Sequence, residues 1–139
     1  MTVPGATDLG ARPPCKRLIV VVDDDAGIRD TLADLLDLEG YQITTAADGR
    51  EALIKLRRTG ADTPCLILLD LMMPVMTGPE FRVQQQNDPH LGSIPVCILS
   101  ADAEGRSKAN ALGCEFLAKP VRIEQVLAVI ARHCDPPLA

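Results

Sequence analysis

The stretch ILLDLMMPVMTG, residues 67–78, carries an apolar run into a single aspartate, Asp70, and then leaves through Met-Met-Pro to a glycine. A carboxylate at the edge of an apolar core is destabilising unless it is hydrogen-bonded, paired with a cation or placed beside a metal. We therefore expect Asp70 to have partners elsewhere in the chain. Those partners should indicate what the protein does.

Two kinds of segment alternate on both sides of this stretch. Apolar, strand-like runs occupy residues 17–22, 41–47, 65–70, 94–100 and 115–118. Segments with helical spacing occupy residues 26–40, 49–60, 79–87, 104–112 and 122–134, and the one at 104–112 is short. Strands that are apolar throughout are covered on both faces. The order predicts an α/β fold: a doubly wound, five-stranded parallel sheet in the flavodoxin-like order 2-1-3-4-5, with helices on both faces.

The folded part is predicted to be one domain over residues 17–134. Residues 1–16 hold three prolines and two glycines without periodicity and are expected to form a flexible leader, with residues 135–139 as a short tail. The 139 residues carry 14 basic and 19 acidic side chains, a net charge of −5, and no basic cluster longer than Arg57-Arg58. A nucleic-acid partner for this domain is not expected.

The cysteines and the hydropathy pattern predict the compartment. The five cysteines, at 15, 65, 97, 114 and 134, form no C-x-x-C pair. They are interpreted as small buried hydrophobic residues in a reducing cytoplasm. The first residues of the sequence lack a basic region followed by an apolar stretch, and no apolar run approaches the length that crosses a membrane. We therefore expect a cytoplasmic protein with no membrane partner.

Polar residues follow the predicted strands at one edge of the sheet. Asp23–Asp25 end the first strand, Asp70 the third and Ser100 the fourth, while Lys119 follows the fifth. Ligands of doubly wound sheets bind beyond the carboxyl ends of the strands, where the strand order reverses. Neighbouring carboxylates raise one another's pKa unless a cation lies among them. An all-oxygen acidic pocket suits Mg²⁺, with Mn²⁺ as an alternative, and the lysine and hydroxyl suit a phosphoryl group.

Four motifs at these strand ends resemble the receiver domain of two-component response regulators. They are VVDDD (21–25), DLMMPVMTG (70–78), LSA (99–101) and KP (119–120), and the resemblance spans residues 17–134. It implies a phosphorylation-dependent signalling switch in a phosphorelay, with no separate catalytic domain. Asp70 would be the phosphoacceptor, and the donor a phosphohistidine of a sensor histidine kinase or a histidine phosphotransfer protein. The downstream protein target stays unidentified.

The same resemblance assigns the other site residues. Mg²⁺ would be held by Asp24, by Asp23 through water, by Asp70 and by the backbone carbonyl of Met72. Ser100 would be the switch hydroxyl, Lys119 the lysine that pairs with phosphate, and Phe116 the aromatic side chain that changes orientation on phosphorylation. The Lys119-Pro120 peptide bond is commonly cis in this family, and the alternative is an ordinary trans turn.

Several of these residues have simpler interpretations. Asp25 is expected to cap the first helix rather than to bind metal. Ser100 could satisfy local backbone groups, and Phe116 could be a plain core residue. For the whole chain, one alternative is a receiver-shaped interaction module that never uses phosphate. Another is a hydrolase of the haloacid dehalogenase type, which needs a second aspartate where Met72 stands.

The segment between Ser100 and Lys119 departs from the resemblance. It is about three residues shorter than in most receivers, and its helical part, AEGRSKANAL (103–112), offers few apolar side chains. We expect a short, mobile fourth helix. Because receivers often dimerise through this helix, we expect a monomer that passes its signal by binding a partner.

Overall fold

The computed structural model describes residues 17–58 and 63–134, so the predicted leader and tail lie outside the described residues. Within them, strands and helices alternate as the sequence predicts. The elements are β1 (Leu18–Val22), α1 (Ala26–Leu38), β2 (Gln42–Ala46), α2 (Gly49–Arg57), β3 (Leu66–Asp70), α3 (Gly78–Gln86), β4 (Val96–Ser100), α4 (Gly105–Ala111), β5 (Glu115–Ala118) and α5 (Ile123–His133).

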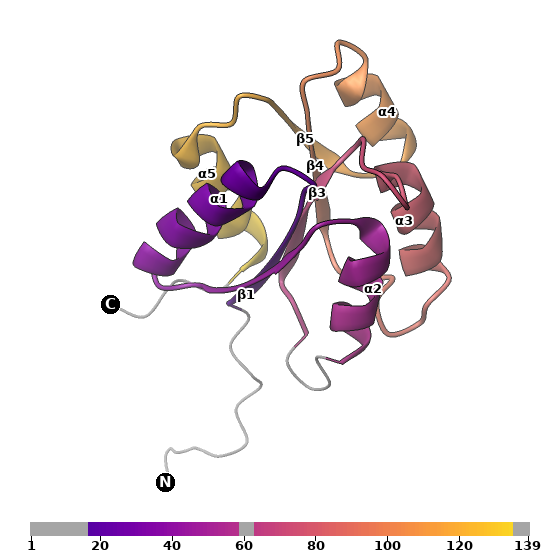
Figure 1. Cartoon of the computed structure of the whole chain (residues 1–139), viewed down its shortest axis with the longest axis horizontal. Helices are drawn as coiled ribbons and strands as arrows, with labels where there is room; N and C mark the ends of the chain where they lie inside the picture. The colour runs from indigo at the N-terminus through magenta and orange to yellow at the C-terminus, as the bar shows by residue number, and fades with distance from the viewer. Residues whose placement is uncertain (1–16, 59–62, 135–139) are drawn as a thin grey trace, which may run out of the picture.

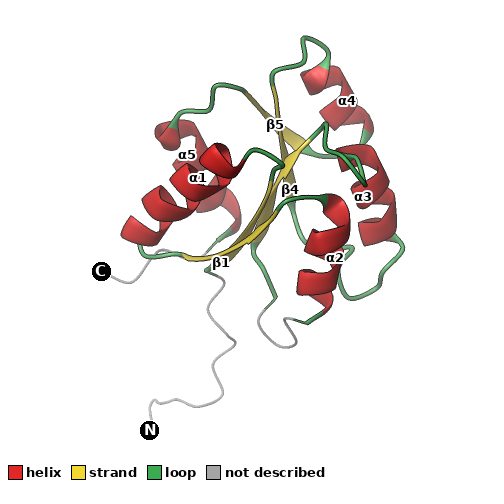
Figure 2. Ribbon diagram, in the orientation of Figure 1, coloured by secondary structure: helices red, strands yellow, loops and turns green. Residues whose placement is uncertain are grey.

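The five strands form one parallel sheet in the order β2-β1-β3-β4-β5, which confirms the predicted topology. Helices α1 and α5 cover one face, and α2, α3 and α4 cover the other (Figures 1 and 2). The register pairs Val22 with Leu69 across β1 and β3, so both strands end at the same edge. The residues that follow β1 therefore lie beside the last residue of β3.

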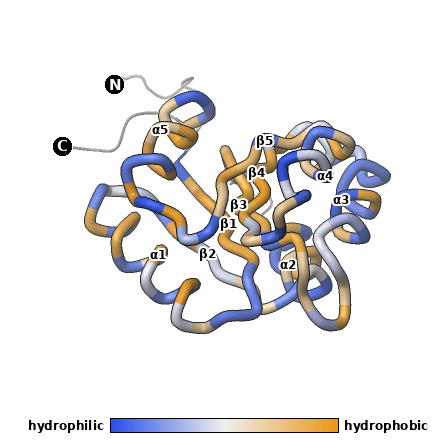
Figure 3. Tube along the Cα trace, turned by 90° about the horizontal axis from the view of Figure 1, so that it is seen from above, coloured by the Kyte–Doolittle hydropathy of each residue, from blue (hydrophilic) through white to orange (hydrophobic). Residues whose placement is uncertain are grey.

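Alternate residues of the central strands supply the two halves of the core. On the α2–α4 side, Val20, Ile67 and Ile98 pack with the fully buried ring of Phe81. On the α1 and α5 side, other strand residues pack with Leu36 and Ile130. The apolar strands run through the middle of the molecule, between helices whose outer surfaces are more polar (Figure 3). Burial on both faces explains why these strands are apolar throughout.

Side-chain caps fix where three helices begin. The Asp25 carboxylate accepts the amide of Ile28 at 3.2 Å, which confirms Asp25 as the cap of α1. Asp48 caps α2 in the same way, accepting the Glu51 amide at 2.8 Å. Thr77 caps α3 in a reciprocal capping box, and α3 begins at Gly78, one residue before the predicted start.

The fourth helix is short, as predicted. It has seven residues, its Glu104 cap makes no side-chain hydrogen bond, and only Gly105 and Ala109 are buried. A helix of two turns without a cap depends on packing for its stability. No helix within residues 17–58 and 63–134 has the length and apolar character needed to cross a bilayer.

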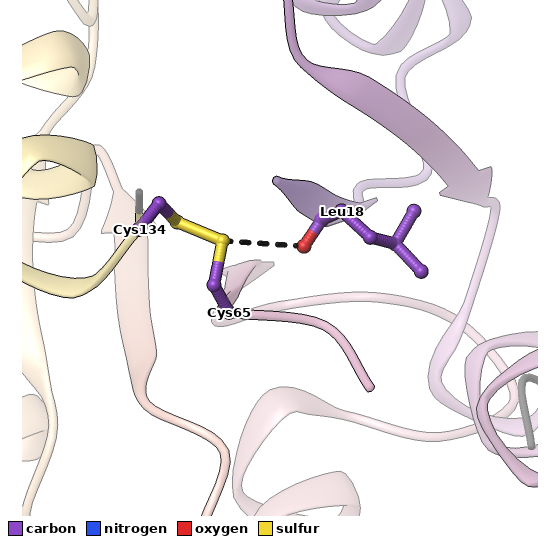
Figure 4. The surroundings of a disulfide bond; sticks show 3 residues. All are labelled: Leu18, Cys65 and Cys134. Atoms are coloured by element: carbon purple, nitrogen blue, oxygen red, sulfur yellow. Dashed lines mark hydrogen bonds between the residues drawn. A yellow bond between two sulfur atoms is a disulfide. The ribbon is translucent and has the colours of Figure 1, made fainter. Parts of the chain in front are cut away.

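The prediction that the cysteines are unpaired is wrong for two of them. Cys65 and Cys134 form a disulfide with their Cα atoms 5.2 Å apart (Figure 4). Cys97 and Cys114 are free and buried, as expected. The pairing joins residues separated by 69 positions, so it depends on the fold bringing the start of β3 against the end of α5. The spacing of the cysteines in the sequence does not indicate that contact.

Candidate functional site

Three aspartates gather where β1 and β3 end. Each of Asp23, Asp24 and Asp70 offers a carboxylate oxygen, and these oxygens lie within 4.8 Å of one another. Asp23 is fully buried, Asp70 is nearly so, and Asp24 is exposed. The pocket therefore has two oxygens set into the core and one at its mouth. This confirms that the three predicted carboxylates meet in one place.

Lys119 reaches the same pocket from the end of β5. Its Nζ lies 2.8 Å from Asp23 Oδ2 and 3.4 Å from Asp70 Oδ1. Its backbone amide donates to the carbonyl of Ser100 at 2.9 Å, and its peptide bond to Pro120 is cis. Burial alone would lower the pKa of Lys119, but Asp23 and Asp70 raise it above its usual value. The side chain is a fixed positive charge between two carboxylates.

The Asp70 carboxyl has a raised pKa. Burial and the neighbouring Asp23 charge raise the pKa of the Asp70 carboxyl to about 6, against the opposing effect of Lys119. One lysine therefore does not fully compensate the acidic pocket. A further cation beside the carboxylates would restore the ionised form, which is the form that can act as a nucleophile.

Asp102 organises the loop that carries Ser100. The Ser100 hydroxyl is buried and accepts the Asp102 amide at 3.0 Å. The Asp102 carboxylate accepts the Glu104 amide at 2.9 Å and pairs with Lys108 Nζ at 2.7 Å. These bonds lower the pKa of Asp102, with the Lys108 hydrogen bond as the main cause. The Asp102 side chain is thus directed to α4.

Phe116 lies half-buried against the start of α4. A Cβ atom on Gly105 would lie 2.7 Å from the Phe116 ring and 3.2 Å from Ser100 Cβ, so glycine leaves the space that the ring fills. The guanidinium of Arg106 sits 5.1 Å from the ring centroid, within the range of a cation–π contact. The ring and Ser100, the predicted switch residue, therefore lie beside the same position of α4.

The loop after Asp70 brings α3 against the strand end. A Cβ atom on Gly78 would lie 2.8 Å from the Asp70 carbonyl oxygen, and the Gly78 amide donates to Leu71 at 2.9 Å. Only glycine allows this close approach. Met72 and Val75 project from the loop with exposed side chains, 62% and 73% accessible.

Some residues of the site escaped prediction from sequence. Arg29 donates to the Asp23 carbonyl at 2.7 Å and so supports the acidic loop from α1. Gly105 also belongs to the surroundings of Phe116, because a Cβ atom there would meet the ring. Arg29 stands six residues after Asp23, close enough along the chain to have been considered. No feature of the sequence near Gly105 indicates that it lies close to Phe116.

The arrangement can bind a hard cation and an anionic group side by side. Carboxylate oxygens without histidine or thiolate suit Mg²⁺, which takes oxygen ligands and retains water. Lys119 supplies the positive charge and Ser100 the hydroxyl that a phosphoryl group needs. One carboxylate oxygen of Asp70 lies 3.4 Å from the Lys119 ammonium.

Comparisons with known proteins indicate the same family as the sequence motifs. The sequence model of the response regulator receiver domain matches residues 19–131. Response regulator MprA of Mycolicibacterium vanbaalenii is 34% identical over 113 residues, which cover 79% of this chain and 47% of MprA. Protein PilG of Pseudomonas aeruginosa is 35% identical over 120 residues, which cover 83% of this chain and 85% of PilG. The chain spans about half the length of MprA.

Solved structures agree with the sequence relatives. Chemotaxis response regulator CheY4 of Vibrio cholerae superposes with a TM-score of 0.74 and 33% identity, covering 83% of this chain and 96% of CheY4. A response regulator receiver protein from Pseudomonas putida gives a TM-score of 0.75 at 25% identity, over 90% of this chain and all of that one. The chain belongs to the receiver domain family of two-component response regulators.

Proposed function

We propose that this receiver domain is a phosphorylation-dependent switch in which Asp70 takes a phosphoryl group from a phosphohistidine. The donor would be a sensor histidine kinase or a histidine phosphotransfer protein, and the site of action the cytoplasm. The observation that carries the proposal is the meeting of Asp70, Lys119 and two further aspartates at one sheet edge.

The chemistry assigned to Asp70 is an in-line displacement. A carboxylate oxygen of Asp70 forms a bond to phosphorus, the bond between phosphorus and the donor imidazole nitrogen breaks, and that nitrogen keeps the electron pair. Lys119 would then turn from Asp23 to the phosphoryl oxygens, where negative charge increases. Ser100 would donate its hydroxyl to another phosphoryl oxygen. Its acceptor role toward the Asp102 amide leaves the hydroxyl proton for this bond.

The donor set fits a divalent cation. Asp24 and Asp70 would hold Mg²⁺ directly, Asp23 through water, and Met72 through its backbone carbonyl. When bound, the ion would neutralise the carboxylates and stabilise charge on the phosphoryl oxygens. The raised pKa of Asp70, caused first by burial and then by the Asp23 charge, supports this assignment, because a cation beside the carboxylate would favour its ionised form.

Movement of Ser100 toward the phosphoryl group would alter the space beside Phe116. The ring and the Ser100 side chain both lie beside Gly105 at the start of α4. We infer that the ring turns inward on phosphorylation and that the surface around β4 and β5 changes with it. A downstream protein would read this surface, with the receiver acting as a monomer.

Mass measurement after incubation with acetyl phosphate and Mg²⁺ tests the proposal. The wild-type chain should gain one phosphoryl mass, and Asp70→Asn should gain none. Asp25→Asn is the matched control, because Asp25 caps α1 beside the pocket and should leave phosphorylation intact. A wild-type chain that gains no mass would favour the interaction module that never uses phosphate.

A further inference from the structure

The disulfide connects the two segments that carry the phosphoryl site. Cys65 directly precedes β3, which ends in Asp70, and Cys134 directly follows α5, which comes after Lys119. At the other end of these segments, Lys119 and Asp70 are 3.4 Å apart. One ion pair and one disulfide therefore close a ring through β3 and α5. The bond restrains the end of α5 relative to the strand that holds the phosphoacceptor.

The surroundings of the two sulfur atoms accommodate both redox states. Cys65 is buried, with 2% exposure, whereas Cys134 is partly exposed. Cys65 Sγ lies 3.4 Å from the Leu18 carbonyl oxygen, which would accept a hydrogen bond from a Cys65 thiol (Figure 4). A surface pocket of about 160 Å³, lined by Cys65 and His133 among others, opens beside the bond. The reduced form would leave no buried thiol without an acceptor.

The other described cysteines are not expected to take part in disulfide exchange. Cys97 and Cys114 are both buried. Burial raises the pKa of the Cys97 thiol to about 12 and also raises that of Cys114. The thiolate is the nucleophile in disulfide exchange, so these two residues stay inert. Among the cysteines of residues 17–58 and 63–134, exchange is therefore expected only at the pair formed by Cys65 and Cys134.

We propose that Cys65 and Cys134 form a reversible redox site, opened by a dithiol reductant, that sets how firmly α5 is held to the sheet. A thiolate of the dithiol attacks the more exposed Cys134 sulfur, and the protein S–S bond breaks with Cys65 leaving as a thiolate. The second thiol of the reductant then releases Cys134. The dithiol becomes a disulfide, and its two electrons and two protons pass to the protein sulfurs.

The cellular location determines which redox state of Cys65 and Cys134 is the resting one. Cytoplasmic disulfides are usually transient and often sense redox state, because thiol systems keep that compartment reducing. With the cytoplasmic location proposed above, the reduced form would be the resting one and the disulfide would form under oxidation. The redox chemistry itself does not depend on phosphoryl transfer at Asp70.

Helix α5 should remain docked after reduction. Val126, Val129 and Ile130 stay buried against the sheet. Arg132 Nε still donates to Glu115 at 3.1 Å, and His133 contacts the same carboxylate. The loss is therefore the restraint on a loop of 69 residues rather than the packing itself. The reduced chain should fold, with its Tm lowered by roughly 10 °C.

Thiol counting and thermal unfolding test the proposal on the full chain. Of five cysteines, three should react with a thiol reagent after denaturation of the oxidised protein, and five after treatment with dithiothreitol. Dithiothreitol should lower the Tm of the wild type and of the control Cys15→Ser. The double variant Cys65→Ser/Cys134→Ser should have the same Tm as the reduced wild type, and dithiothreitol should not change that Tm.

Amide hydrogen exchange of the wild type in both redox states gives a second readout that needs no variant. Exchange in the last turn of α5 should be faster in the reduced protein, and unchanged in β1. Five reactive thiols in the oxidised sample, an equal Tm in both states, or equal exchange in α5 would each overturn the proposal. None of these readouts uses acetyl phosphate, so a failure here is distinct from a failure of phosphorylation.

Discussion

Lys119 pairs more closely with Asp23 than with Asp70: its Nζ lies 2.8 Å from Asp23 Oδ2 and 3.4 Å from Asp70 Oδ1. In the form described here, the lysine that should bind phosphate is therefore engaged by a carboxylate of the proposed metal site. The ammonium and a divalent cation compete for the same negative charge.

The first prediction follows from this competition. Lys119→Met should bind Mg²⁺ about tenfold more tightly, a difference of about 1.4 kcal/mol, because the ammonium no longer occupies the pocket. The same variant should take up phosphate from acetyl phosphate at least about tenfold more slowly, since a charge on the phosphoryl oxygens is lost. Isothermal titration calorimetry and intact mass measure the two effects. Lys55→Met, on α2, is the control and should change neither.

A second prediction concerns pH. Because folding raises the pKa of Asp70 from 3.8 to about 6, the folded chain binds the extra proton between these values, and stability is lost as pH rises through about 6. Asp70→Asn removes this loss. Without divalent cations, it should be more stable than wild type by about 2 kcal/mol at pH 7 and no more stable at pH 4.

Urea unfolding across this pH range measures the difference. Asp30→Asn, an exposed substitution on α1, should show no such pH-dependent gain. Added Mg²⁺ should stabilise the wild type and much less the Asp70→Asn variant, and EDTA should reverse the effect. A constant difference between pH 4 and pH 7 would contradict the raised pKa.

A third prediction uses Gly105. Alanine favours helix over glycine by up to about 1 kcal/mol, but its Cβ would lie 2.7 Å from the Phe116 ring. We expect the clash to dominate, so that Gly105→Ala is less stable than wild type and the Phe116 ring moves. Ser107→Ala, exposed on the same helix, should be neutral or stabilising.

Ring NMR signals offer a direct view of that movement. The chain has two phenylalanines, so labelled Phe gives two sets of signals. Those of Phe116 should shift in Gly105→Ala, while those of the buried Phe81 should not. A variant that gained stability with unmoved signals would show that the space beside the ring is larger than described.

A fourth prediction concerns the lifetime of the phosphoryl group. Met72 follows Asp70 by two residues and is exposed, and we expect its side chain to shield Asp70 from water. Met72→Asn should therefore speed dephosphorylation several-fold, measured as loss of phosphoryl mass after removal of the donor. Val83→Asn, exposed on α3, is the control. Equal decay rates in Met72→Asn and wild type would exclude shielding.

A fifth prediction concerns assembly. Helix α4 has only seven residues and no side-chain cap, so it offers a small surface for dimerisation. Light scattering should report a monomer both without and with beryllofluoride, a mimic of the phosphoryl group. A stable dimer in the beryllofluoride sample, abolished by substitutions in α4 or α5, would contradict this.

The parallel sheet could be predicted from periodic patterns, and the acidic pocket from the strand ends once the flavodoxin-like strand order was assumed. Asp23 and Asp70 stand at the ends of two apolar strands, and the strand order makes them neighbours. The Cys65–Cys134 bond could not be predicted, because it depends on where α5 ends against the sheet. The contact of Gly105 with Phe116 depends likewise on how α4 packs on β5.

The bonds of Asp102 have a mechanical consequence. Its amide holds the Ser100 hydroxyl and its carboxylate holds Lys108, so one residue links the buried strand end to the second turn of α4. A shift of Ser100 toward Asp70 would pull on the hydrogen bonds of Asp102 and would therefore move α4. Lys108→Met should then leave phosphorylation of Asp70 intact while reducing the change in α4 amide exchange that phosphorylation causes.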